Sequence, residues 1–473
     1  MSKPTNSSSL ARLTILICCL SLTRTATAQV MTLDDCVMMA MMSNKQIQAT
    51  DHMVNEYKHT QKSVYANFFP NINLNAADVY STLQGSSLMN IATPIGNFAA
   101  QQLQNVLPLI VSNTMRNYLA QDLAQAITPL NPEVGFKTKN VLSAKITLEQ
   151  PIYTGGKIST ANRMGKLGVE MATHAQELAR EEIMVEVYDA YQKLVKAKEM
   201  EKVAHQYDSL LTQLDSEVKS AVKHGMASRN DEMKVAVKKS DAELKIRQAE
   251  NGIRLATMNL CQLIGKPLDS KIEPVYENDD FLELVDQNAS ATDRTEYHLL
   301  ELNSKMANEK VRMEKAAYMP QLGLMLNAGM IDGMELLDSK LFNHKFNMAV
   351  GAVLKVPLFH ANETKHKVAA AKESLYQEQL RQEELTGKMN LDLRQQANNV
   401  DEARLELQLR KRNLEQCEEN LKISRSSYSA GMETLSDLLT AQVLWQEAYA
   451  ELVESRYQAK VKMMKWRKAA GRI

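Results

Sequence analysis

The stretch that decides the fold is Ala430-Gly431-Met432-Glu433-Thr434, which interrupts a proline-free run over residues 358–473. The run is rich in Glu, Lys, Ala, Leu and Gln, which favour helices, and it has no proline to break one. Glycine readily adopts the left-handed conformation that ends a helix, and a following Ser or Thr can cap the next helix. We therefore expect a helical hairpin with its turn at Gly431.

A matching break lies 206 positions earlier, where His224-Gly225-Met226-Ala227-Ser228 interrupts the proline-free run over residues 152–266. The arm from Gly156 to His224 would be about 100 Å long as one continuous helix. In both runs, apolar side chains recur at spacings of three and four, which indicates coiled-coil-like packing. Examples are Leu211, Leu214, Val218 and Ala221 in the first run, and Leu439, Val443, Gln446, Ala450, Val453 and Tyr457 in the second, where Gln446 is the one polar interruption.

The two halves of the chain also match outside the hairpins. Pro151-Ile152-Tyr153 corresponds to Pro357-Leu358-Phe359 at the same offset of 206. Pro70 corresponds to Pro320 at an offset of 250, which implies additional residues between Pro70 and Pro151. The sequence therefore predicts an internal duplication in which each half has the order helix, strand, strand, long helix, turn, helix.

Four segments alternate apolar and polar residues with period two, as strands with one apolar face do. Their length, about 8 to 11 residues, suits tilted membrane strands, although a half-buried sheet in a soluble protein fits the same pattern. Four strands cannot close a barrel, and open edges in lipid leave backbone groups unpaired, so three copies would be needed to supply 12 strands. The apolar positions are Ile72, Leu74, Ala76; Leu142, Ala144, Ile146, Leu148; Leu322, Leu324, Leu326, Ala328; and Met348, Val350, Ala352, Leu354, Val356.

Residues 1–28 are typical of a secretory signal. Lys3 and Arg12 supply positive charge ahead of a short apolar segment over residues 13–22. Ala26-Thr27-Ala28 then offers a cleavage site that follows small residues. The apolar segment is about 10 residues long and a membrane-spanning helix needs about 20. We expect a mature chain that begins at Gln29 and is located outside the cytoplasm.

Composition and motif content favour neither an enzyme nor a nucleic-acid-binding protein. Lys and Arg number 56, as do Asp and Glu, so no basic excess points to nucleic acid or to a polybasic membrane anchor. No phosphate-binding loop or catalytic triad stands out from the spacing of residues, and we expect no cofactor. Outside the signal, Cys36, Cys261 and Cys417 are too widely spaced for a zinc site or a disulfide framework, and we expect buried, small apolar side chains.

Two groups of residues have metal-binding side chains, but a structural role suits each better. Methionines cluster near the start of the mature chain, where they more often fill irregular helix packing than bind copper or silver. His52, Glu56 and His59 share one helix face, which we interpret as a solvated polar face. We therefore predict no metal site. The methionines are Met31, Met38, Met39, Met41, Met42 and Met53.

The order of these elements resembles the TolC-like outer-membrane efflux family over essentially the whole mature chain. Thr32-Leu33-Asp34-Asp35 opens a helix that ends at Phe69-Pro70, and Arg294-x-Glu296-Tyr297 opens its counterpart, which runs to Pro320. The most specific similarity spans residues 428–439, where Tyr-x-x-Gly is followed by Asp six residues after the glycine. Gly225 and Asp231 repeat that spacing in the first half.

The resemblance implies a mixed α and β fold, predominantly α. It would be a homotrimer with a 12-stranded β-barrel, four strands per chain, in the lipid of the outer membrane, continuous with a long α-helical barrel in the periplasm. The chain would divide into a signal (1–28), a first repeat (29–267), an equatorial linker (268–292) and a second repeat (293–473).

The resemblance also implies a function, that of a channel in a tripartite efflux or type I secretion system. Its partners would be a periplasmic adaptor protein and an inner-membrane transporter, with no nucleic acid. A soluble periplasmic coiled-coil scaffold or adaptor protein is the alternative that the residues leave open.

In the family, side chains near the hairpin tips close the periplasmic mouth. By resemblance, Asp437 matches an aspartate that forms a ring, Tyr428 matches a gate tyrosine and Asp231 its partner. Capping of the following helix is the alternative role of Asp437. Thr440 stands where many members have a second aspartate.

Glu433 departs from the family pattern, because it occupies a position where some members have arginine. Arg229 or Arg425 would then be the replacement cation. The resemblance places adaptor docking at the turns themselves, at Gly225, Met226, Gly431 and Met432.

Overall fold

The computed structural model describes residues 29–80, 84–85, 136–276, 285–286, 289–336, 346–359 and 361–473. The predicted signal at residues 1–28 and the loop over residues 86–135 lie outside these ranges. The chain forms two compact units, each assembled from distant segments. The first unit takes in Met1–Asp51, His174–His298 and Glu384–Ile473, and the second takes in His52–Thr173 and Leu299–Glu383.

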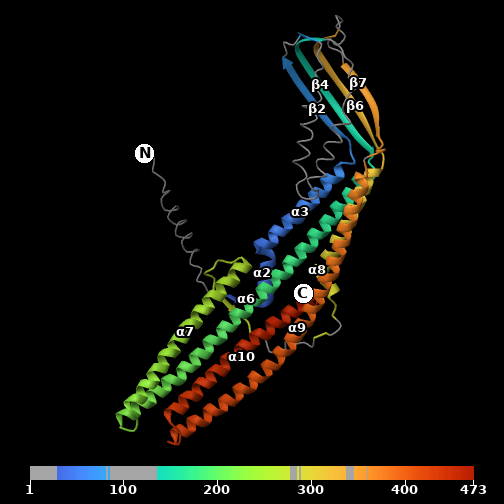
Figure 1. Cartoon of the computed structure of the whole chain (residues 1–473). Helices are drawn as coiled ribbons and strands as arrows, with labels where there is room; N and C mark the ends of the chain where they lie inside the picture. Colours follow the sequence, from blue (N-terminus) through green and yellow to red (C-terminus); the bar gives the residue numbers. More distant parts are fainter. Residues whose placement is uncertain are drawn as a thin grey trace, which may run out of the picture. The chain divides into compact units, whose positions relative to one another are not determined.

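Four long helices form two hairpins, as the sequence predicts (Figure 1). Helix α6 (Lys157–Lys223, 67 residues) turns into α7 (Arg229–Ile264, 36 residues). Helix α9 (Glu363–Ser429, 67 residues) turns into α10 (Leu435–Ala469, 35 residues). None of the described helices is both long and apolar enough to cross a membrane.

One hydrophobic core joins the two hairpins in the first unit. Leu211 and Val218 of α6 are fully buried there, and so is Val235 of α7, while Leu438 of α10 is 2% exposed. Leu211 and Val218 belong to the spacing of three and four residues that predicted coiled-coil-like packing, and the structure confirms the prediction for them. The remaining buried members of this core are Tyr207, Leu214, Ala242, Leu435, Leu439 and Trp445.

A second core lies at the other end of the first unit. Strand β1 (Gln29–Met31) pairs in parallel with β5 (Ile272–Pro274), and helix α2 (Leu33–Ser43) packs beside α6 and α7. The Tyr191 hydroxyl, on α6, donates to the Met31 carbonyl at 3.0 Å and accepts from the Val275 amide at 2.9 Å. This buried tyrosine therefore fixes the small sheet to α6.

The prediction of a single helix from Thr32 to Phe69 is wrong. Helix α2 ends at Ser43, and α3 (Lys45–Ala66) starts after Asn44, whose ψ of 128° is extended. The Asn44 side-chain amide donates to the Leu263 carbonyl at 3.2 Å, and its oxygen accepts from the Gln46 amide at 2.9 Å. The break is stabilised because Asn44 satisfies the carboxyl end of α7 and the start of α3 at once.

The second unit contains an antiparallel sheet in the strand order β2-β4-β6-β7. The strands are β2 (Asn71–Tyr80), β4 (Phe136–Tyr153), β6 (Gln321–Leu336) and β7 (Phe346–Lys355), and the short β3 (Gln84–Gly85) pairs with β4. They coincide with the four predicted strands. Helix α8 (Thr295–Lys315) and the 3-10 turn η3 (Ala316–Tyr318) precede β6.

The strand register places apolar side chains opposite apolar ones and polar side chains opposite polar ones, so that each forms a row across the sheet. Leu74 lies opposite Ile146, which lies opposite Ala328, which in turn lies opposite Met348. The adjacent row contains Asn73, Thr147 and Asn327, and the Thr147 hydroxyl donates to the Asn327 side-chain oxygen at 3.0 Å. The predicted alternation therefore gives the sheet one apolar and one polar face.

The join between β4 and α6 is built on two adjacent glycines with positive φ, Gly155 (+65°) and Gly156 (+87°). A Cβ at Gly155 would lie 2.6 Å from the Met319 Cβ and 2.7 Å from the Ala316 carbonyl oxygen, whereas one at Gly156 would meet only the Ser159 hydroxyl, at 3.7 Å. Both positions thus require the left-handed conformation, but only at Gly155 is there also no room for a Cβ, because Met319 and the Ala316 carbonyl lie too close.

This difference gives a paired test. Gly156→Ala should destabilise the fold by about 1–3 kcal/mol, the cost of a left-handed non-glycine residue. Gly155→Ala should cost more, because Met319 or the η3 backbone must also move. Melting curves followed by circular dichroism compare the two variants. Equal losses of thermal stability would contradict the close approach at Gly155.

Candidate gating and docking site at the hairpin tips

The two hairpin turns have the same backbone hydrogen bonds. In the first turn, Gly225 donates to the Val222 carbonyl at 3.0 Å and Met226 donates to the Ala221 carbonyl at 2.8 Å. In the second turn, Gly431 donates to Tyr428 at 3.0 Å and Met432 donates to Ser427 at 2.9 Å. This pair of bonds is the Schellman motif, and φ is +74° at Gly225 and +73° at Gly431. Both glycines are therefore required by the turn.

The helix that follows each turn starts with the same capping box. The Asp231 carboxylate accepts from the Ser228 hydroxyl at 2.7 Å and the Ser228 amide at 3.3 Å, while the Asp231 amide donates back to that hydroxyl. The Asp437 carboxylate accepts from the Thr434 hydroxyl at 2.6 Å and the Thr434 amide at 3.1 Å. Each box satisfies amides at the helix start that have no partner within the helix.

These contacts favour the ionised form of each aspartate. The pKa of Asp437 lies below its ordinary value of 3.8, first because of the Thr434 hydroxyl and then because of the Thr434 amide. The pKa of Asp231 is lowered first by the Ser228 hydroxyl and then by Lys234, whose ammonium donates to Oδ1 at 3.1 Å. The capping role considered for Asp437 is thus present within one chain.

Tyr428 lies at the end of α9, half-buried against the core between the hairpins. Burial raises the pKa of its hydroxyl, and the negative charges of Asp231 and Glu217 raise it further. The predicted partners Tyr428 and Asp231 therefore lie within electrostatic reach. Among the described residues no hydrogen bond joins Tyr428 to Asp231, whose oxygens accept from Ser228 and Lys234.

The structure does not bring Glu433 together with either arginine proposed for it. Arg229 forms an ion pair with Glu232 at 2.7 Å, and Arg425 lies 3.8 Å from Glu217. One carboxylate oxygen of Glu433, Oε2, is buried and has no hydrogen-bond partner. The Thr440 hydroxyl donates to the Ser436 carbonyl at 2.8 Å.

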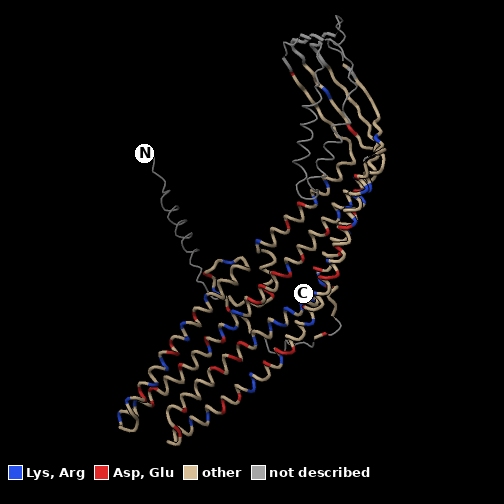
Figure 2. Tube along the Cα trace, in the orientation of Figure 1, with Lys and Arg blue, Asp and Glu red and all other residues tan. Residues whose placement is uncertain are grey.

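The outermost side chains of the two turns are both methionines. Met226 is 77% exposed and Met432 is 76% exposed, and a Cβ added at either glycine would meet nothing within 4 Å. Each turn therefore projects one large apolar side chain into solvent, next to charged residues that Figure 2 colours by sign.

Comparison with known proteins relates this chain to a family. Residues 300–472 match the family model described as Outer membrane efflux protein. The fold matches the outer membrane protein VceC of Vibrio cholerae (TM-score 0.70, 14% identity, 93% of this chain and 96% of that chain). It also matches the outer membrane channel CmeC of Campylobacter jejuni (TM-score 0.72, 15% identity, 93% and 85%). The chain thus has the fold of these outer membrane proteins, and its residues 300–472 match the outer membrane efflux protein family.

The chain is also similar to a curated protein, the alkaline protease secretion protein AprF of Pseudomonas aeruginosa. The two sequences are 22% identical over 327 residues, and the match covers 66% of this chain and 66% of the relative. The chain thus spans about two thirds of the length of that relative. The families and folds matched are those of channel proteins rather than enzymes.

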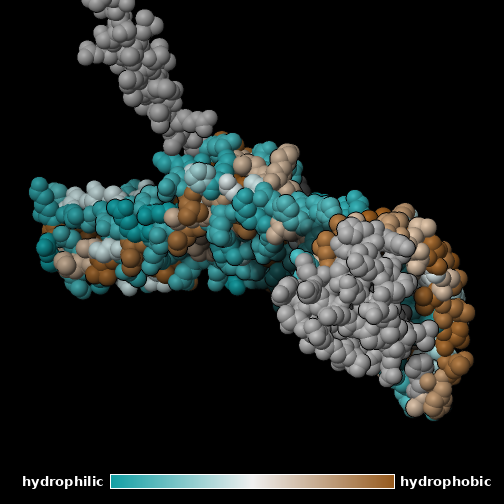
Figure 3. Space-filling model, turned by 90° about the horizontal axis from the view of Figure 1, so that it is seen from above, coloured by the Kyte–Doolittle hydropathy of each residue, from teal (hydrophilic) through white to brown (hydrophobic). Residues whose placement is uncertain are grey.

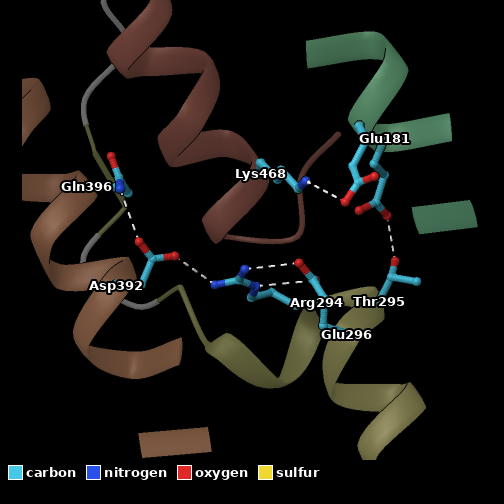
Figure 4. A network of polar contacts seen from close by, with 8 residues as sticks. Glu181, Arg294, Thr295, Glu296, Asp392, Gln396 and Lys468 are labelled. Carbon is cyan, nitrogen blue, oxygen red and sulfur yellow. Dashed lines mark hydrogen bonds and ion pairs between the residues drawn. The ribbon is translucent and has the colours of Figure 1, made fainter. Parts of the chain in front are cut away.

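A polar network in the first unit was not predicted from the sequence (Figure 4). Arg294, whose side chain is only 11% exposed, binds Glu296 at 3.0 Å and Asp392 of α9 at 2.9 Å. Close by, the Thr295 hydroxyl donates to Glu181 of α6. Lys468 of α10 lies 3.9 Å from Glu182, also of α6. The network ties the start of α8 to three long helices, and the only signal for it was the motif Arg294-x-Glu296.

The three cysteines of the predicted mature chain lie in or beside the hydrophobic cores of the first unit. Cys36 and Cys261 are fully buried in the core around β1, as predicted, and Cys417 is half-buried between the hairpins. Among the residues that the structure describes, no group of three or more His, Cys, Asp or Glu side chains could hold a metal ion.

The two capping boxes predict a pH dependence at the tips. A lowered pKa in the folded state means a contribution to stability that is full above the unfolded pKa of about 3.9 and is lost as the pH falls through the folded value. Protection of the tip amides from hydrogen exchange, corrected for intrinsic rates, should therefore start to drop below about pH 5, one unit above 3.9, and should keep dropping as the pH falls through the folded pKa, which lies below 3.8.

Single substitutions test the capping boxes of α7 and α10 one at a time. Thr434→Ala should lower amide protection at the start of α10 and leave α7 unchanged, and Ser228→Ala should do the reverse. Mass spectrometry of peptides from each tip measures both. Unchanged protection on acidification and in both variants would mean that the boxes do not hold the helix starts.

Proposed function

We propose that three copies of this chain form an export channel in the outer membrane of a Gram-negative bacterium, extending into the periplasm. The channel would pass substrates from its periplasmic end to the exterior as part of a tripartite efflux or type I secretion system. The family match supports this function, as do the relatives, whose names describe outer membrane channels and a protein-secretion component.

The observation that carries the proposal is the exposed apolar face of the sheet (Figure 3). Ile72 and Leu74 of β2 are 64% and 70% exposed, and Val350 and Leu354 of β7 are 69% and 64% exposed. Contiguous apolar surface of this kind marks an interaction site, and alternation with a polar face is typical of strands in an outer-membrane barrel. The polar row of Asn73, Thr147 and Asn327 would then face the lumen.

The edges of the sheet support a trimer. Among the described strands, β2 pairs only with β4 and β3 does not extend that edge, while β7 pairs only with β6. In lipid each unpaired backbone group costs several kcal/mol, so β7 of one copy has to pair with β2 of the next. Three copies would close a 12-stranded barrel with four strands from each chain.

Two helices carry apolar stripes that another copy could cover. Four exposed apolar residues on α7, and four on α9, fall within about 40° of one another when each residue advances about 100° around the helix. Each is at least half exposed, and adjacent copies in an α-helical barrel would bury them. They are Met233, Val237, Leu244 and Leu255 on α7, and Leu391, Leu405, Leu409 and Ile423 on α9.

An internal duplication accounts for the repeated lengths and turns. Helices α6 and α9 both have 67 residues, and α7 and α10 have 36 and 35. We divide the mature chain into a first repeat (29–267), an equatorial linker (268–292) and a second repeat (293–473). A soluble coiled-coil scaffold or adaptor would not need the exposed apolar face of the sheet.

The tips would serve as the gate and as the docking end. Asp437, Tyr428, Asp231, Glu433 and Arg229 would line the closed periplasmic mouth, with Asp437 from three copies forming an acidic ring. The capping box uses only Oδ2 of Asp437 and the residue is exposed, so capping leaves room for the ring role.

The proposed partners follow from the position proposed for the hairpin tips, at the periplasmic end of the channel. The turns at Gly225, Met226, Gly431 and Met432 would meet a periplasmic adaptor protein, and an inner-membrane transporter would supply the energy. Substrate selection would then lie mainly outside this chain.

Trimer formation tests the proposed function directly. A cysteine pair across the two sheet edges, Asn73→Cys with Ala349→Cys, should give disulfide-linked trimers in outer-membrane fractions, because both positions lie on the polar face and β2 and β7 of adjacent copies would run side by side. Non-reducing electrophoresis detects them, and Asn73→Cys alone is the control. Recovery of a stable monomer without detergent would refute the proposal.

The gate has its own test in planar bilayers. Asp437→Asn removes the negative charge and should weaken cation selectivity and block by multivalent cations from the periplasmic side, since a ring of carboxylates attracts cations. Thr434→Ala removes the cap but keeps the charge, so its selectivity should match the wild type. Identical selectivity in all three proteins would leave Asp437 with a capping role alone.

A further inference from the structure

The two tips share one backbone and differ in charge. Tip 1, defined as residues 223–230, contains Lys223 and Arg229 and no acidic residue, while tip 2, residues 429–436, contains Glu433 and no basic residue. The aspartates that follow, Asp231 and Asp437, occupy equivalent positions and do not contribute to the difference. Because the turn hydrogen bonds correspond one to one, the contrast lies in the side chains alone.

The charges of tip 1 are available to another molecule. Lys223 is exposed, and no ion pair involves it among the described residues. The Arg229 side chain is 75% exposed, and its ion pair with Glu232 is an exposed contact three residues along the same helix. Exposed pairs of this kind contribute little, so Arg229 can exchange partners at small cost.

The charge of tip 2 has no ion-pair partner among the described residues. The Glu433 side chain is half-buried, and no ion pair between described residues involves its carboxylate. The charge is therefore left for a cation supplied from outside. Arg229 and Arg425, the cations expected to meet it, contact Glu232 and Glu217 instead.

Each tip also presents an apolar anchor. Met226 and Met432, at corresponding turn positions, expose 77% and 76% of their surface. A flexible thioether side chain adapts to irregular apolar sockets, and its burial is a substantial source of affinity. A tip therefore consists of one methionine beside a charge, positive in tip 1 and negative in tip 2.

We propose that the partner at the tips is a periplasmic adaptor with two kinds of socket at its helical-hairpin ends. One socket would pair an apolar floor with carboxylates and accept tip 1, and the other would pair an apolar floor with lysine or arginine and accept tip 2. The inference rests on the docking role proposed above. It adds a rule for register, because a shift by one tip would bring like charges together.

The test uses the full-length channel, immobilised in lipid nanodiscs, and two synthetic helical hairpins as probes. The probes share an apolar loop, and one carries two glutamates beside the loop while the other carries two lysines. Biolayer interferometry at low salt compares wild type with three variants: Lys223→Ser with Arg229→Ser, Glu433→Gln, and Met226→Ser with Met432→Ser.

The expected pattern is selective. The tip 1 variant should lose about fivefold in affinity for the acidic hairpin only, and Glu433→Gln should lose a similar factor for the basic hairpin only. The methionine variant should bind both at least about tenfold more weakly. Raising the salt should weaken wild-type binding of both hairpins.

Equal responses of both hairpins to the charge variants, or no binding at low salt, would overturn the inference. The wild-type preparation is also assayed for trimers and for conductance in planar bilayers. Normal trimers that conduct but do not discriminate between the hairpins would leave the proposed function standing. Failure to form trimers or to conduct would instead count against the proposed function itself.

Discussion

Burial of one apolar seam between two helical hairpins is the interaction on which the rest of the structure depends. Leu211, Val218, Val235 and Leu438 come from three different helices and meet in a core that neither hairpin could complete alone. Long helices gain most of their stability from such tertiary packing rather than from intrinsic propensity. Because the seam runs close to the turns, it also holds both tips at the same end of the first unit (Figure 1).

The sheet exposes its apolar side chains, whereas the helical core buries them. In the helical core apolar side chains are withdrawn from solvent, whereas Leu74 and Val350 on the sheet remain exposed in the single chain. The polar row is internally satisfied where Thr147 donates to Asn327. An apolar face exposed opposite a polar face is the arrangement expected of a wall with lipid on one side and water on the other, which agrees with the fold shared with outer membrane channels.

The two tips have the same backbone conformation but side chains of different charge. The Schellman bonds and the capping boxes satisfy the polar groups of both turns without help from Met226, Met432, Lys223 or Glu433. Those side chains are therefore free to differ in charge between the tips without disturbing the turns. The capping box and the acidic ring also do not compete for Asp437, since the box needs only one of its two oxygens.

The sequence by itself determined what depends on neighbours along the chain. The proline-free runs, the glycine turns, and the period of each helix and strand were readable because backbone geometry and local caps decide them. It did not determine the break at Asn44, where the deciding acceptor, the Leu263 carbonyl, is 219 residues away. Nor did it determine the Arg294 network or the missing partner of Glu433. Those features belong to the tertiary structure, because packing alone decides which distant donors and acceptors meet.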